Sequence, residues 1–99
     1  MARHGTGRSD ANQAEIVTHL RTYPGVYVKV ISCFPGVMDL LVYCNGILTW
    51  WEVKRPGHRK DLTKAEREIL DACPGVSYIV TTIEEADHIL ETWHNVFLP

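Results

Sequence analysis

The dipeptide Asn45-Gly46 constrains the fold of this chain most strongly, because it stands between two segments rich in strand-forming residues. Both central positions of a type I′ turn need a positive φ, which Asn and Gly adopt readily. The flanking segments are VMDLLVYC (37–44) and ILTWWEVK (47–54), with many β-branched and aromatic residues. We therefore predict an antiparallel hairpin in which paired residues have numbers that sum to about 91.

Turn and capping signals on either side of the hairpin predict the remaining elements. Pro-Gly pairs separate the periodic segments. Thr63 with Glu66, and Thr82 with Glu85, have the spacing of capping boxes and predict two helix starts. In chain order we expect a helix over 11–23, strands over 26–32, 37–44 and 47–54, a helix over 62–73, a strand over 76–82 and a helix over 83–93.

This order, α-β-β-β-α-β-α, indicates one small α/β domain with a mixed sheet. Residues 1–8 show no periodicity and are expected to form a flexible arm, with Ser9 or Asp10 capping the first helix, so the domain spans 9–99. The composition, 45% hydrophobic and 22% charged, is typical of a folded globular protein. No apolar run is long enough for a signal peptide or a membrane span, so we expect a cytoplasmic protein without a membrane partner.

The second strand of the hairpin carries charges near its end. Glu52 and Lys54 are two residues apart and so share one face of the strand. The expected register places Asp39 opposite Glu52, with Cβ atoms about 5 Å apart. Two carboxylates at this spacing repel one another unless a positive charge offsets them. Lys54 supplies one such charge, and a divalent cation would supply more.

Paired carboxylates of this kind suit Mg²⁺ or Mn²⁺, which are typically coordinated by one or two carboxylates together with a substrate phosphate. Such a cation activates water and stabilises the charge that develops on a phosphodiester. The basic segment KRPGHRK (54–60) follows directly. We expect it to contact the DNA backbone without reading the sequence, through Arg55, His58, Arg59 and Lys60.

The segment VMDLLVYCNGILTWWEVK resembles the D-x(n)-E-x-K signature of the PD-(D/E)XK nuclease superfamily. The wider layout resembles the VRR-NUC (virus-type replication-repair nuclease) branch, with a Glu on the first helix, a Gly-x-x-Asp entry, E-V-K, an "LT" helix start and an "E-E-A" helix. The similarity covers roughly residues 12–90, nearly the whole chain. It implies a restriction-endonuclease-like αβββαβ core with an extra C-terminal helix.

The resemblance also implies roles for individual residues. Glu15, Asp39 and Glu52 would bind the metal and act in catalysis, the backbone carbonyl of Val53 would be a further ligand, and Lys54 would be the catalytic lysine. Two positions depart from the family pattern. Met38 stands where the family commonly has Pro, and Glu66 stands where it has Gln, so Glu66 is an auxiliary site residue at most.

The function implied by the resemblance is that of a Mg²⁺- or Mn²⁺-dependent DNA endonuclease, selective for branched DNA such as a four-way (Holliday) junction, in phage replication, recombination or repair. A domain this small offers little surface to grip a duplex, and the apolar tail WHNVFLP (93–99) is suited to burial by a partner subunit. We therefore expect a homodimer, whose two sites match a symmetric junction.

Other interpretations remain open at this point. The chain could be a restriction-like enzyme, although 99 residues leave little room for base-reading elements. It could be a DNA-binding module without catalysis, or a structural protein in which Glu52 and Lys54 form an ordinary surface ion pair. Capping alone explains Glu66. Trp50 and Trp51 are expected to pack, with base stacking as the alternative for Trp50.

Overall fold

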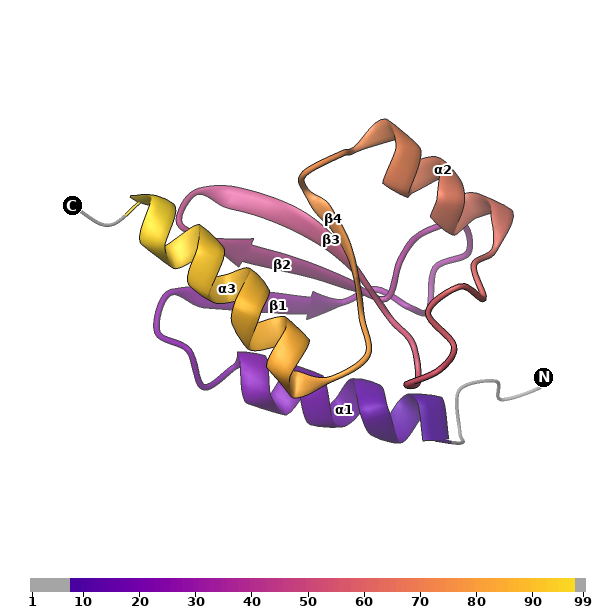
Figure 1. The fold of residues 1–99 in the computed structure, drawn as a ribbon, viewed down its shortest axis with the longest axis horizontal. Helices are drawn as coiled ribbons and strands as arrows, with labels where there is room; N and C mark the ends of the chain where they lie inside the picture. Colours follow the sequence, from indigo (N-terminus) through magenta and orange to yellow (C-terminus); the bar gives the residue numbers. More distant parts are fainter. Residues whose placement is uncertain (1–7, 98–99) are drawn as a thin grey trace.

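The computed structural model describes the backbone of residues 8–97 and the side chains of residues 11–93. It contains three helices and four strands in the predicted order (Figure 1). The elements are α1 (Arg8–Leu20), β1 (Val26–Val30), β2 (Leu40–Cys44), β3 (Ile47–Val53), α2 (Lys64–Ala72), β4 (Ser77–Val80) and α3 (Ile83–Phe97). None of the helices in this part of the chain has the length and apolarity to span a membrane.

The two ends of the chain are only partly covered. Of the predicted arm over 1–8, all but Arg8 lies outside the described residues, and Arg8 is the first residue of α1. Helix α3 continues to Phe97, beyond its predicted end at Trp93, because neither Pro nor Gly interrupts the sequence there. The side chains of the apolar tail after Trp93 lie outside the description.

The four strands form one mixed sheet in the order β1-β2-β3-β4. The pairs β1–β2 and β2–β3 are antiparallel, while β3 and β4 run parallel and are joined through α2. Leu40 pairs with Trp51 and Cys44 with Ile47, so the predicted hairpin register is confirmed. Asn45 and Gly46 have φ angles of 53° and 85°, as the predicted turn requires.

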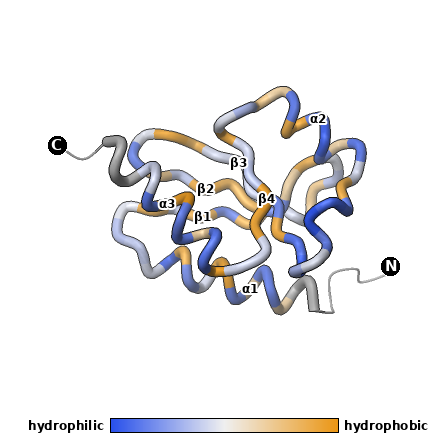
Figure 2. Tube along the Cα trace, in the orientation of Figure 1, coloured by the Kyte–Doolittle hydropathy of each residue, from blue (hydrophilic) through white to orange (hydrophobic). Residues whose placement is uncertain are grey.

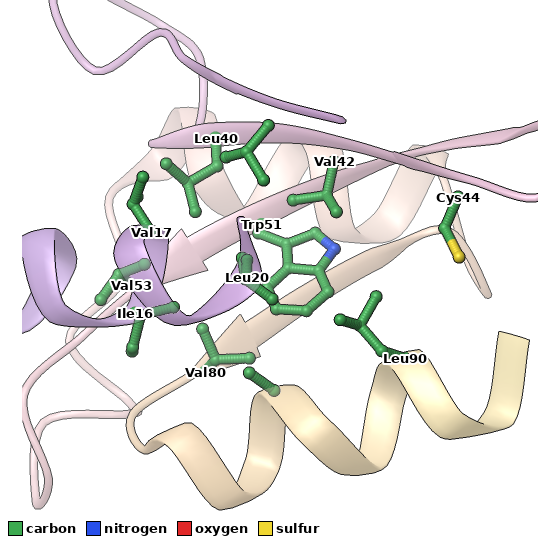
Figure 3. Close-up of a cluster of buried hydrophobic side chains, with 12 residues drawn as sticks. Ile16, Val17, Leu20, Leu40, Val42, Cys44, Trp51, Val53, Val80 and Leu90 are labelled. Carbon is green, nitrogen blue, oxygen red and sulfur yellow. The ribbon is translucent and has the colours of Figure 1, made fainter. Parts of the chain in front are cut away.

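The hydrophobic core lies between the sheet and the pair α1 and α3. The fully buried Trp51 is its largest side chain, and Figure 3 shows it among Leu20 of α1, Val80 of β4 and Leu90 of α3. Helix α2 belongs to the opposite face of the sheet, toward which Lys54 points, and it packs beside β4. The other strands of that face are covered less, as exposed Tyr and Leu side chains on β1, β2 and β3 indicate.

The two predicted capping boxes have different outcomes. At α2 the box is complete, since the N–H of Glu66 donates to Thr63 Oγ1 and the N–H of Thr63 donates to Glu66 Oε1. At α3 only one of the two bonds of the box forms, in which the N–H of Glu85 donates to Thr82 Oγ1. The carboxylate of Glu85 accepts from the N–H of Thr81 in place of the N–H of Thr82. The prediction for α3 was therefore wrong in one bond.

Candidate functional site

Four ionisable side chains gather where β3 ends. Lys54 Nζ lies 3.1 Å from Glu66 Oε1 and 3.4 Å from Glu52 Oε2. Asp39 joins them from the start of β2, and its charge acts on Glu52 together with that of Glu66. We call Asp39, Glu52, Lys54 and Glu66 the acid–lysine cluster. The structure thus brings together three of the four predicted catalytic residues and the auxiliary residue Glu66.

Backbone hydrogen bonds hold these side chains in place. The Oδ2 atom of Asp39 accepts the N–H of Val53 at 2.9 Å, which extends the contacts between β2 and β3 beyond the last paired residue. The N–H of Lys54 donates to the Val80 carbonyl at 2.9 Å and fixes the end of β3 against β4. The acids and the lysine therefore stand on a rigid strand end, which favours precise placement of reacting groups.

Asn12 of α1 is a further positioning residue that the sequence did not single out. Its Nδ2 atom donates to the carbonyl of Lys54 at 2.9 Å and to that of Thr81 at 3.2 Å. It therefore ties α1 to the ends of the two parallel strands. An amide inside an amphipathic helix looks like any solvated residue, so no pattern in the sequence indicates this contact.

Glu52 is the most constrained member of the cluster. Only 4% of the residue is exposed. Its Oε2 atom faces Lys54, whereas Oε1 is buried without a hydrogen-bond partner, the one such side-chain atom in the described part of the chain. A buried oxygen of this kind is costly unless a proton or a cation satisfies it.

The pKa values show how the cluster divides its charge. Burial, the charge of Asp39 and the proximity of Glu66 raise the pKa of Glu52 to about 9. Burial also raises the pKa of Asp39, although the N–H of Val53 opposes this shift. In Glu66, the cost of burial is outweighed by the hydrogen bonds from the N–H of Thr63, from the Glu52 carboxyl group and from Lys54, so its pKa is lowered.

Lys54 remains charged in this environment. Burial by itself lowers its pKa, but the hydrogen bond to Glu66 and the charges of Glu52 and Glu66 outweigh burial and raise it. Glu66 and Lys54 therefore form the ion pair of the cluster, and Glu52 is left to hold a proton when no cation is bound. Lys54 is therefore an ammonium, which has no lone pair with which to accept a proton.

Glu66 thus does more than cap α2. It combines the capping box with the contact to Lys54. The sequence did not predict this contact, because it depends on where the loop over 55–62 places the start of α2 in space relative to β3. An acid at position 66 adds a negative charge to the cluster. This charge raises the pKa of Lys54 and disfavours ionisation of Glu52.

The substitution Glu66→Gln is expected to lower the pKa of Glu52 from about 9, because it removes a like charge beside a buried carboxyl. The Gln amide oxygen still accepts from Thr63, so the capping box is kept, while the buried ion pair with Lys54 is lost. Carbon-13 NMR of the side-chain carboxyl of Glu52, titrated without divalent cations, measures the shift. Glu68→Gln, an exposed acid on the same helix, is the matched control; an equal midpoint in both variants would contradict the expected coupling.

The donor set of the cluster fits a hard divalent cation in part. Asp39 and Glu52 supply oxygens from adjacent strands, and the unpartnered Glu52 Oε1 has the character of an unused ligand. Among the residues described, no three His, Cys, Asp or Glu side chains are spaced to hold a metal by themselves. Two carboxylates completed by water and phosphate are the usual arrangement for Mg²⁺. The backbone carbonyl of Val53 stays a predicted ligand.

Glu15, the other predicted metal ligand, lies on an exposed part of α1. It lines an open hollow of about 590 Å³ together with Asn12, Arg55 and His58. Nothing in the described geometry joins Glu15 to a group of three metal-binding side chains. Its metal role stays a prediction, and its observed neighbours are those of a charged hollow beside the basic loop.

The predicted DNA-binding loop is the hydrophilic segment between β3 and α2 in Figure 2. Arg59 is already engaged, because its guanidinium donates to the Glu85 carboxylate and, at 3.0 Å, to the carbonyl of Ile79. His58 Nδ1 lies 2.7 Å from Asp61 Oδ2. Lys60 is exposed and Arg55 lines the hollow. The loop is therefore braced by acids, and its role with DNA stays a prediction.

Comparisons of this chain with protein-family models, with curated proteins and with solved structures give no match. The resemblance to the VRR-NUC nucleases therefore stays a hypothesis. Any function assigned to this chain rests on the residues of the acid–lysine cluster and on their contacts.

Proposed function

We propose that this chain is a divalent-metal-dependent DNA endonuclease of the PD-(D/E)XK type, with a restriction-endonuclease-like core. One observation carries the proposal: Asp39 and Glu52 meet on adjacent strands beside Lys54, and a buried Glu52 oxygen lacks a partner. The observed order α-β-β-β-α-β supports it, because it agrees with the core implied by the sequence. A surface ion pair explains neither the burial nor the unpartnered oxygen.

Each residue of the cluster has a task in this proposal. Asp39 and Glu52 would hold Mg²⁺ or Mn²⁺, with the Val53 carbonyl as a further ligand. When bound, such a cation provides Lewis-acid assistance to phosphodiester hydrolysis. Lys54 directs its ammonium at the charge that develops on the scissile phosphate, and Glu66 keeps that ammonium protonated and oriented.

We propose branched DNA, such as a four-way junction, as the substrate and a homodimer as the acting form. The exposed Lys60 and the half-buried Arg55 follow the cluster directly and are suited to meet phosphates on either side of the cut. Two copies related by a two-fold axis would present two such sites, which suits a symmetric junction.

Cleavage of a DNA panel tests the proposal. The panel contains a single strand, a duplex, splayed arms, a flap and a four-way junction, each with Mg²⁺, Mn²⁺ or EDTA. We expect metal-dependent cleavage that Asp39→Asn abolishes without unfolding the protein, with the junction cut best. If DNA affinity does not depend on the metal and no DNA is cleaved at any Mn²⁺ concentration, the result would instead favour a DNA-binding module without catalysis.

A further inference from the structure

One face of the sheet carries a row of exposed apolar side chains. Tyr27, Tyr43 and Leu48 lie side by side on β1, β2 and β3, since Tyr27 pairs with Tyr43 and Tyr43 with Leu48. Their exposed fractions are 62%, 43% and 54%. They lie on the face opposite the Trp51 core, away from β4, beside which α2 packs. This is an exposed apolar surface in which two of the three side chains are aromatic.

This row leads toward the acid–lysine cluster. The next row on the same face is formed by Lys29, Leu41 and Trp50, and Glu52 follows Trp50 on the same side of β3. Successive rows are about 7 Å apart, so the Tyr27–Tyr43 row lies about 13 Å from the acids. That distance is spanned by roughly two nucleotides of an extended strand.

The chemistry of these rows suits nucleic-acid bases. Tyr27 and Tyr43 are exposed rings and Trp50 is a half-buried ring beside them, and bases stack on such rings without regard to sequence. Lys29 is exposed beside them, and the described residues of the two rows include no carboxylate that would repel a phosphate. Aromatic side chains on neighbouring strands of an open sheet are also the means by which other sheet proteins hold unpaired nucleotides.

We propose that the face formed by Tyr27, Tyr43, Leu48, Lys29 and Trp50 is a stacking platform for unpaired bases of the DNA strand that enters the cluster. Cleavage of that strand by the cluster rests on the proposed function, while the binding of unpaired bases does not. A platform of this kind selects DNA with unpaired nucleotides next to the cut, because paired bases present no free ring face. It therefore favours branch points at which nucleotides are unpaired, as in a flap, in splayed arms, or in a four-way junction whose central base pairs have opened.

The test measures binding without cleavage. A fluorescent single strand of about 12 nucleotides is titrated in EDTA with wild type, with Tyr27→Leu/Tyr43→Leu and with the matched control Tyr27→Phe/Tyr43→Phe. Leu preserves apolar area, and Phe preserves the ring. We expect the Leu variant to bind at least about ten-fold more weakly and the Phe variant to bind within about three-fold of wild type. An abasic strand of equal length should also bind at least about ten-fold more weakly to wild type.

Several results would overturn the platform. These are no binding of the single strand by wild type, equal binding by the Leu and Phe variants, or equal binding of the abasic strand. A fall in molecular mass of the Leu variant in light scattering, with unchanged DNA binding, would assign the face to a second copy of the chain. Circular dichroism verifies that each variant is folded.

The platform and the nuclease can fail separately. If no DNA in the panel is cut but the Leu variant loses single-strand binding, the platform stands and the catalytic proposal falls. If cleavage is observed and the Leu variant has the KM of wild type on a flap, the platform falls and the nuclease stands. We expect the Leu variant to raise KM by at least about ten-fold and to change kcat by less than about three-fold.

Discussion

The substitution Lys54→Met is expected to reduce the rate of DNA cleavage by about 10²–10³-fold or more, because it removes a preorganised positive charge from the scissile phosphate. Met preserves most of the apolar stem of the lysine and leaves the N–H of residue 54 bonded to the Val80 carbonyl. DNA binding in EDTA should therefore stay within a few-fold of wild type. Single-turnover cleavage of the preferred panel substrate with saturating Mn²⁺ measures the effect.

Lys64→Ala is the matched control, since Lys64 is an exposed lysine at the start of α2. We expect it to cleave at the wild-type rate. Because the pKa of Lys54 is raised above its ordinary value of 10.5, loss of its proton should not lower the cleavage rate at any pH below that value. Cleavage by Lys54→Met at the wild-type rate would remove Lys54 from the mechanism and leave the Lys54–Glu66 pair a structural contact.

Local signals in the sequence predicted the parts of the fold that local interactions decide. Asn45-Gly46 sets the hairpin register, and this register alone is enough to place Asp39 opposite Glu52. Thr63 with Glu66 likewise determines where α2 begins. In each case a backbone conformation or a short-range hydrogen bond leaves one solution, so neighbouring residues carry the information.

The contacts that the sequence did not predict join segments far apart in the chain. Arg59 forms an ion pair with Glu85 of α3, so the guanidinium of a residue predicted to contact DNA is held by an acid of the protein itself. The carboxylate of Asp87 in α3 is hydrogen-bonded to the Tyr23 hydroxyl and to a ring nitrogen of His19, which ties α3 to the end of α1. Such pairs depend on how helices dock on the sheet, and a single sequence contains no period or spacing for them.

The substitution Glu52→Gln is expected to stabilise the protein at about pH 8 in EDTA by on the order of 3 kcal/mol. In the folded wild type Glu52 holds its proton up to a pKa of about 9, whereas the unfolded chain loses it near the ordinary value of 4.5. Between these values the folded state binds more protons, so raising the pH lowers the free energy of unfolding, by at most about 1.4 kcal/mol per pH unit. Gln is neutral throughout and avoids this loss, and near pH 4.5 the two proteins should be about equally stable.

With saturating Mn²⁺ at about pH 8, the wild type should instead be more stable than Glu52→Gln. A cation that binds only the folded state stabilises the wild type and replaces the proton on Glu52. The variant lacks this carboxylate and should gain little. Urea unfolding at about pH 5 and pH 8, with EDTA or Mn²⁺, gives four free energies of unfolding for each protein. Glu68→Gln should follow the wild type under every condition. If Glu52→Gln gains as much stability from Mn²⁺ as the wild type, Glu52 is not a ligand, and its raised pKa reflects only the burial of a carboxyl group beside Asp39 and Glu66.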